Sequence, residues 1–310
     1  MIGNRSAGQL RRLALLERTP SIILSVAVLN TIAGLVCWAD WRATGQGAWV
    51  TTFFKYPNGV LTVLLTTVEV VLCYWVWRAF GPGDKLRNAW FFITLAAAGH
   101  FCGRLMSQGL FRLAPGDTSQ DVYEAGVVIG GTIEMALLLC GLVSVARICR
   151  DSGLVGRMTA LDYVILILVA ANGAHSLLEI REYVSAGKLI TWSILLSWPT
   201  DILVIILLML AITIRRAVDG MGRGLIASCW AFYVAGIVLT SMGDVGLWLI
   251  RTPLIPGRLA TLGWFVWFLA DSAFALAPAF QVAAIERARF RAALTLTAMH
   301  DDTLVGLSPQ

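Results

Sequence analysis

The chain consists of long apolar runs separated by short polar segments over almost its whole length. Each run comes close to the roughly 20 residues that an α-helix needs to cross the hydrocarbon core of a bilayer. The runs lack the alternation of apolar and polar positions typical of membrane β-strands. The pattern therefore predicts an all-α, polytopic membrane helical bundle with about eight transmembrane helices, at 21–39, 58–77, 88–110, 124–146, 161–180, 199–214, 225–250 and 261–285.

Positively charged residues indicate the orientation of these helices, because arginine and lysine gather in short cytoplasmic loops. They are frequent in the basic segment 1–18, in alternate loops and in the segment 286–310 that follows the last run. The loops between are poor in them. We therefore expect both termini in the cytoplasm and a multi-pass protein of the plasma membrane, the inner membrane of a bacterium.

Composition narrows the class of protein. Apolar residues make up 58% of the chain and charged residues 14%, against about 45–50% and about 25% in soluble domains. These values exclude a water-soluble enzyme, a nucleic-acid-binding protein and a disordered chain. The net charge of +5 matches the loop topology and an anionic inner leaflet as partner, so we expect no nucleic acid to bind.

No motif for catalysis or metal binding is present. The sequence contains no glycine-rich phosphate loop, no G-x-S-x-G and no H-E-x-x-H. The six cysteines lie in or beside the apolar runs and form no C-x-x-C pair, which argues against a disulfide framework and a thiolate metal site. We expect a protein that is not itself an enzyme and holds no cofactor.

The pattern of the first half recurs about 140 residues later. Trp90 recurs as Trp230 and Gly103 as Gly243. Further matches join Asn30 to Asn172, Gly45 to Gly187, Tyr56–Pro57 to Trp198–Pro199 and Pro115–Gly116 to Pro256–Gly257. The chain is therefore expected to be a duplication, with four-helix repeats at 19–150 and 159–285. Four spans are an even number, so the repeats should be parallel and related by a pseudo-two-fold axis along the membrane normal.

An aromatic stretch precedes a proline in each repeat. Lys55 lies within the first stretch, which predicts a segment at the membrane interface rather than a span. Pro57 and Pro199 are expected in the first turn of the helices that follow, where a missing N–H costs nothing. Asp201 is then expected to cap the N-terminus of its helix.

Ionisable residues inside apolar runs are costly and need an account, since a charge in hydrocarbon costs about 2.5–3.5 kcal/mol on insertion scales. We predict an intramembrane polar pocket that is formed by Glu69, His100, Arg104, Glu134, Asp244 and Asp271. Arg104 and Asp244 hold equivalent positions of the repeats, so they are expected to form a structural ion pair across the interface or to line a pocket. The acids outnumber the bases, which favours either protonated carboxyls bonded to neighbouring helices or a pocket sensitive to protons or cations.

Two histidines raise one cofactor alternative. His100 and His175 could together ligate a haem b between the third and fifth spans. Neither has a histidine at the equivalent position of the other repeat. We therefore expect both histidines to pack in the bundle or to line the pocket rather than to ligate a haem.

The C-terminal segment suggests a connection to a cytoplasmic domain. A helix-favouring stretch at 284–299 is followed by His300–Asp301–Asp302–Thr303–Leu304–Val305–Gly306–Leu307. This tail resembles the opening of diguanylate cyclase (GGDEF-type) domains, roughly A-x-H-D-x-L-T-G-L-P-N-R. Gly243–Asp244, Pro256–Gly257, Trp264 and Trp267 are similar to features of the multi-pass sensor regions that precede such domains. The GGDEF signature and nucleotide site are not in the chain, so the resemblance implies a sensor region without catalytic activity.

The features together predict an integral membrane sensory or signalling module. A signal in the outer half of the membrane, carried by an unknown small ligand or ion, would pass to a cytoplasmic output domain. The resemblance implies a homodimer or larger membrane complex. The alternatives are a transporter of small solutes or ions, and a structural or electron-transfer subunit of a membrane complex.

Overall fold

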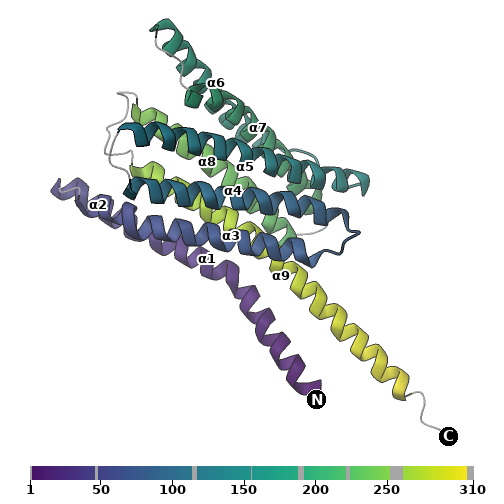
Figure 1. Ribbon diagram of the computed structural model, residues 1–310. Helices are drawn as coiled ribbons and strands as arrows, with labels where there is room; N and C mark the ends of the chain where they lie inside the picture. The colour runs from purple at the N-terminus through teal and green to yellow at the C-terminus, as the bar shows by residue number, and fades with distance from the viewer. Residues whose placement is uncertain are drawn as a thin grey trace.

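The computed structural model describes residues 2–45, 48–113, 117–154, 156–187, 192–220, 224–251 and 261–305. This part of the chain is built of helices joined by short turns and contains no strand (Figure 1). The helices are α1 (Ile2–Thr44), α2 (Ala48–Phe53), the π-helical turn η1 (Phe54–Asn58), α3 (Gly59–Ala79), α4 (Lys85–Leu113), α5 (Asp117–Asp151), α6 (Ala160–Ser185), α7 (Trp192–Asp219), α8 (Leu225–Arg251) and α9 (Thr261–Val305). The prediction of an all-α fold is confirmed.

Within the described residues, six helices are long and apolar enough to cross a membrane. The segments with this character are Ala14–Thr44, Tyr56–Ala79, Lys85–Met106, Gly130–Asp151, Leu225–Gly243 and Phe265–Thr295. The protein is therefore a multi-pass helical membrane protein. The predicted runs at 161–180 and 199–214 fall within α6 and α7, which lie outside this set. In the described part of α6 the apolar stretch is Ala160–Ala171.

Six helices pack as a closed ring. Contacts run from α3 to α4, α5, α7, α8 and α9 in turn, and α9 returns to α3. Figure 1 shows α3, α4 and α5 side by side on one face of the bundle. The remaining long helices lie outside the ring, where α1 packs against α9 and α6 packs against α7 and α8. Helices that follow one another in the chain are thus mostly neighbours in space, as short connections require.

Much of the interior of the ring is apolar and rich in aromatic side chains. Trp90 of α4 and Trp230 of α8 are 1% and 3% exposed, and their ring centroids lie 6.4 Å apart. Tyr233 packs against Trp230 at 5.4 Å. Leucine and isoleucine side chains of α5 and α7 complete the core, among them Leu142, Leu207, Leu208, Ile212 and Ile214.

Two glycines allow neighbouring helices to approach closely. A Cβ atom at Gly141 of α5 would lie 2.6 Å from Cγ1 of Ile93 and 3.1 Å from the carbonyl oxygen of Ala89, both on α4. A Cβ atom at Gly236 of α8 would lie 2.8 Å from the ring of Phe274 on α9. Small residues at such crossings are typical of membrane helices, whose association depends on close packing.

Glycine also ends two of the helices. Gly45 follows α1 with a φ of 73°, and Gly187 follows α6 with a φ of 64°. The left-handed region is open to glycine at little steric cost, so both positions act as C-terminal stops. The N–H of Gly45 donates to the carbonyl oxygen of Trp41 at 2.9 Å, and the N–H of Gly187 donates to that of Val184 at 3.1 Å.

The structure corrects the predicted helix starts near the two prolines. Helix α7 begins at Trp192, so Pro199 lies inside the helix rather than in its first turn. Asp201 therefore does not cap the helix; its Cβ lies 3.4 Å from a Cβ built at Gly173 of α6. Pro57 lies in η1, one turn before α3. The chain is already helical across both aromatic stretches, in α2 and η1 before α3 and in the first turns of α7.

The first and last helices extend beyond the bundle at the same end (Figure 1). There Arg287 of α9 forms an ion pair with Glu17 of α1, at 2.8 Å. Arg289 of α9 donates to the carbonyl oxygen of Ala79 at 2.9 Å, at the C-terminus of α3. Helix α9 is therefore held against both α1 and α3 where it leaves the bundle.

Gly141→Ala is expected to destabilise the fold by about 1–3 kcal/mol, because the new methyl group would press on the backbone carbonyl of Ala89. Thermal unfolding of the purified protein in detergent, followed by tryptophan fluorescence, measures the change. Gly130→Ala on the same helix is the control, since no described atom lies within 4 Å of a Cβ at Gly130. Equal melting temperatures for the two variants would contradict the close α4–α5 contact.

Candidate functional site

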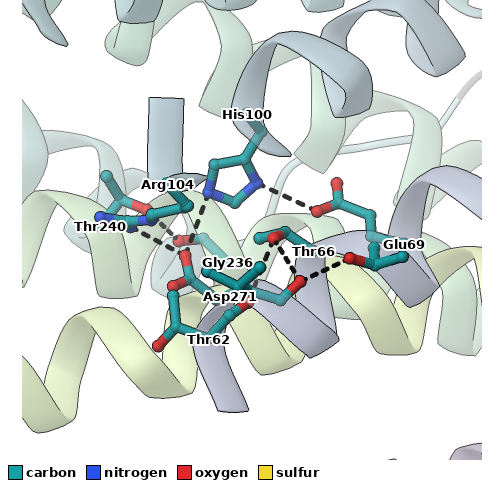
Figure 2. A network of polar contacts seen from close by, with 10 residues as sticks. Thr62, Thr66, Glu69, His100, Arg104, Gly236, Thr240 and Asp271 are labelled. Carbon is teal, nitrogen blue, oxygen red and sulfur yellow. Dashed lines mark hydrogen bonds and ion pairs between the residues drawn. The ribbon is translucent and has the colours of Figure 1, made fainter. Parts of the chain in front are cut away.

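Four ionisable side chains from three helices meet inside the ring, and we call them the ionic cluster: Glu69 of α3, His100 and Arg104 of α4, and Asp271 of α9. The Nδ1 atom of His100 lies 3.0 Å from Oε2 of Glu69, and its Nε2 atom lies 3.1 Å from Oδ1 of Asp271. Arg104 donates to the same Oδ1 atom at 2.8 Å. Figure 2 shows His100 between Glu69 on one side and Asp271 on the other.

The ionic cluster is deeply buried. Glu69 is 5% exposed, His100 8% and Asp271 1%, whereas the side chain of Arg104 is 26% exposed. Charged groups away from water are tolerated when they pair with one another and satisfy their hydrogen bonds. The contacts supply this pairing, and they connect α9 to α3 through the imidazole of His100.

The geometry fixes how many protons the cluster holds. Each ring nitrogen of His100 faces a carboxylate oxygen, so one proton is needed in each of the two contacts. An imidazolium between two carboxylates meets this need, and so does a neutral imidazole beside one protonated carboxyl. In both cases the four side chains together, with Arg104 positive, carry no net charge. Removal of one proton would leave a negative charge in the hydrocarbon region.

Hydroxyl groups surround the ionic cluster but bond to their own helices. Thr66, fully buried one turn before Glu69, donates to the backbone of α3. Ser272 donates to the carbonyl oxygen of Phe268 at 2.8 Å. Thr240 of α8 donates to the carbonyl oxygen of Gly236 at 3.0 Å (Figure 2). Their oxygens keep lone pairs that can accept a hydrogen bond from a water molecule or a ligand.

Glu134 of α5 lies beside the cluster without joining it. Its Cβ atom lies 3.5 Å from a Cβ built at Gly99 of α4, one residue before His100. Glu134 is close enough for electrostatic interaction with His100, Glu69 and Arg104. It forms no hydrogen bond or ion pair with another described residue. Glu134 is thus a third carboxyl at this level of the membrane, available to take up a proton or face a cation.

The structure brings together four of the six predicted pocket residues, with Glu134 adjacent to them. Asp271 and Arg104 form an ion pair that sequence reasoning did not identify, because it matched Arg104 with Asp244. The backbone of Asp244 lies in α8, but its side chain lies outside the described residues, so the Arg104–Asp244 pair stays a prediction. No sequence signal showed that α9 returns to α3 and places Asp271 beside α4.

The contacts of His100 argue against its proposed role as a haem ligand. Both ring nitrogens of His100 are engaged by carboxylates, so neither is available to an iron atom unless the cluster rearranges. The side chain of His175 lies outside the described residues. Haem ligation by His100 does not fit the observed contacts.

A column of aromatic rings leads from the cluster into the core. The His100 ring contacts Phe274 of α9 edge-on, with centroids 5.8 Å apart. Phe274 lies 6.3 Å from Tyr233 of α8, which is followed by Trp230 and Trp90. The ring of Phe274 occupies the space left by Gly236. A shift of His100 or of α9 would therefore change how the side chains of α8 and α9 pack against each other.

No family model, no curated protein and no solved structure matches the chain.

Asp271→Asn is expected to destabilise the protein by about 3–5 kcal/mol, because it leaves the charges of Arg104 and His100 without their shared partner. In the double variant Arg104→Gln/Asp271→Asn both members of the pair are neutral, so its loss should be smaller than the sum of the two single losses. Chemical or thermal unfolding in detergent provides the three values for a double-mutant cycle.

Asp151→Asn is the control for this cycle. Its ion pair with Arg150 spans 3.7 Å, and the two side chains are 55% and 76% exposed, so the loss should stay within about 0.5 kcal/mol. Strict additivity of the Arg104 and Asp271 substitutions would show that the pair does not interact in the folded protein.

Proposed function

We propose that the protein is a sensory or signalling module of the plasma membrane, without catalytic activity of its own. A change at the ionic cluster, made by a small ligand or ion, would alter how α9 packs against α3 and α4. The altered position of α9 would be transmitted to a cytoplasmic output domain. Such a device needs two packing states that the signal stabilises to different extents.

One observation carries this proposal: Asp271 of the ionic cluster and the extension beyond the bundle belong to the same unbroken helix, Thr261–Val305. At 1.5 Å per residue the helix is about 68 Å long, roughly twice the thickness of a hydrocarbon core. Transport across the membrane does not require such an extension of a helix. Transmission of a signal to a domain outside the membrane does require one.

The contacts at the bundle end support the same function. The Glu17–Arg287 pair spans 2.8 Å between side chains that are 35% and 43% exposed. A surface pair of this kind contributes about 0–1 kcal/mol. This pair and the Arg289 bond to Ala79 are weak enough for α9 to change its position at this end of the bundle. Helix α9 is thus firmly bonded at the cluster and weakly held at its exit.

Three features support the proposed duplication into parallel four-helix repeats. Shifting α3, α4 and α5 onto α7, α8 and α9 maps the ring of contacts onto itself. The equivalent residues Gly45 and Gly187 both adopt a positive φ and end equivalent helices. The equivalent Trp90 and Trp230 face each other across the centre of the ring, as residues near a two-fold axis should. The positions of α1 and α6 differ between the halves.

Under this duplication the site is asymmetric. His100 corresponds to Thr240 and Arg104 to Asp244, while Asp271 corresponds to Gly131. The equivalent contact of the other half, between α5 and α7, contains the neutral pair Thr132 and Thr200, whose hydroxyls lie 3.2 Å apart. The proposed signal therefore acts on one half, next to the helix that leaves the membrane.

The output side of the proposal depends on the C-terminal segment. The basic residues near both chain ends favour a cytoplasmic location for them. Helix α9 continues through Ala298, His300 and Leu304, whereas Gly306 and Leu307 of the tail lie outside the described residues. The resemblance to the entry of GGDEF-type domains supports an output domain of that class and, since such domains work in pairs, a homodimer.

The proposal predicts that breaking the cluster moves the exit of α9. Spin labels at Gly83→Cys in the α3–α4 turn and at Leu294→Cys, which is 56% exposed on α9, report the distance by pulsed electron paramagnetic resonance in liposomes. Cys37, Cys102, Cys140 and Cys149 are first replaced by serine. Asp271→Asn is expected to shift or broaden the distance distribution by several ångströms.

Asp162→Asn is the matched control for this measurement. It breaks the buried bond between Asp162 of α6 and Arg216 of α7, which spans 2.8 Å, and leaves the contacts of α9 intact. The distribution should stay that of the parent protein. An unchanged distribution in Asp271→Asn, or the same change in both variants, would contradict signalling through α9.

Transport of protons or small cations is the second candidate, and the position of Glu134 beside the cluster favours it. This function requires proton or cation flux into liposomes that contain the protein, measured with a pH-sensitive or cation-sensitive dye under a membrane potential. The flux should be lost in Glu134→Gln and in Asp271→Asn. A parent protein that gives no flux above that of empty liposomes would contradict transport.

A further inference from the structure

A second feature of the bundle lies apart from the ionic cluster, at the end where α1 and α9 leave it. A groove of about 130 Å³ runs between α1, α8 and α9. Its walls are apolar and are formed by Pro20, Leu24, Leu225, Phe232, Leu276, Phe280 and Ala283. Ser21 and Leu24 at its mouth are exposed, so the groove opens to the surroundings of the bundle.

One end of the groove is charged. Glu17 and Arg287 line it there and form the 2.8 Å ion pair described above. Along α9 the lining residues Leu276, Phe280, Ala283 and Arg287 follow at intervals of three or four, which is one stripe of a helix. The next position of this stripe is Arg291, which is exposed and forms no ion pair with a described residue.

The groove is therefore complementary to an amphipathic lipid, because it is apolar along most of its length and positively charged at one end. Its apolar part begins at Leu276, within the apolar segment Phe265–Thr295, and its cationic end lies about 17–23 Å further along the helix. The acids near this end are already paired, Glu17 with Arg287 and Glu286 with Arg289. Arg18 of α1 likewise forms no ion pair with a described residue, so a net positive charge remains to face an anion.

We infer that this groove is a binding site for an anionic phospholipid, with one acyl chain between α1, α8 and α9 and the phosphate group beside Arg287 and Arg291. Arginine-rich segments of membrane proteins lie on the cytoplasmic side, where the lipid leaflet is anionic. The positively charged end of the groove would therefore face anionic lipid headgroups. An apolar chain in the groove would lie against the partly exposed ring of Phe232 and the exposed side chain of Leu24. The site does not require the proposed signalling function, although Arg287 belongs to both, beside the phosphate group here and as the partner of Glu17 at the exit of α9.

The experiment is native mass spectrometry of the full chain in a non-ionic detergent, with phosphatidylglycerol or phosphatidylcholine added at equal concentrations. The site predicts that phosphatidylglycerol is retained more strongly. Arg291→Gln should weaken its binding about five-fold, the effect of one cationic side chain at an anionic surface. Ser21→Phe, which places a ring in the mouth of the groove, should weaken binding by a similar factor although no charge changes.

Two control variants distinguish the site from general attraction. Arg150→Gln removes an exposed arginine at the C-terminal end of α5, and Leu29→Phe enlarges a side chain that is 66% exposed on α1, outside the groove. Both should bind phosphatidylglycerol like the parent protein. Equal binding of the two lipids, an Arg150→Gln effect equal to that of Arg291→Gln, or no effect of Ser21→Phe would overturn the inference. Competition by inorganic phosphate together with an inert Ser21→Phe would indicate an anion site only, which also overturns it.

Discussion

The bond between Arg104 and Asp271, with His100 beside it, is the interaction on which the arrangement of the bundle depends most. Charges in a membrane interior must find partners, and these partners come from helices far apart in the chain. Because Asp271 must reach Arg104 and His100, the side chains of α9 and α4 have to point at one another across the inside of the ring. Glu69 then fixes α3 relative to both. An apolar core alone would allow the helices to pack with several different shifts along their axes. The bonds of the ionic cluster can form with one of these arrangements.

The shape of the neighbouring residues follows from this requirement. Gly99 leaves room for Glu134 next to His100, and Gly236 leaves room for the ring of Phe274, which packs edge-on against the imidazole. The hydroxyls of Thr66, Thr240 and Ser272 bond to their own helices, so they bring polarity to the site without competing for its ions. The cluster is therefore compact, and a ligand that binds to its ring nitrogens or to Oδ1 of Asp271 must replace an existing contact. Glu134, by contrast, can take up a proton without breaking one of these bonds.

Sequence reasoning found the helices and most of the polar residues but not their partners. Apolar length predicted the membrane helices, since a continuous run has few other ways to satisfy its backbone in lipid. The cost of intramembrane charge singled out Glu69, His100, Arg104 and Asp271. Their assembly depends on α9 closing the ring against α3, a contact between distant segments that no local pattern encodes. The cap assigned to Asp201 was wrong for a related reason: packing extends α7 to Trp192, and a proline inside a membrane helix can be accommodated. The predicted Arg104–Asp244 pair and the suggested role of His175 as a haem ligand involve side chains outside the described part of the chain.

The position of Arg287 along α9 has a mechanical consequence. Asp271 lies about 24 Å to one side of it and Val305 about 27 Å to the other, at 1.5 Å per residue. If the Glu17–Arg287 contact serves as the fulcrum and α9 stays straight at Pro278, which lies in the first arm, α9 is a lever with two arms of nearly equal length. A tilt that carries Asp271 one way would carry the far end of the helix slightly farther the other way. A displacement at the cluster would then reach the end of α9 with little change in size and with its direction reversed.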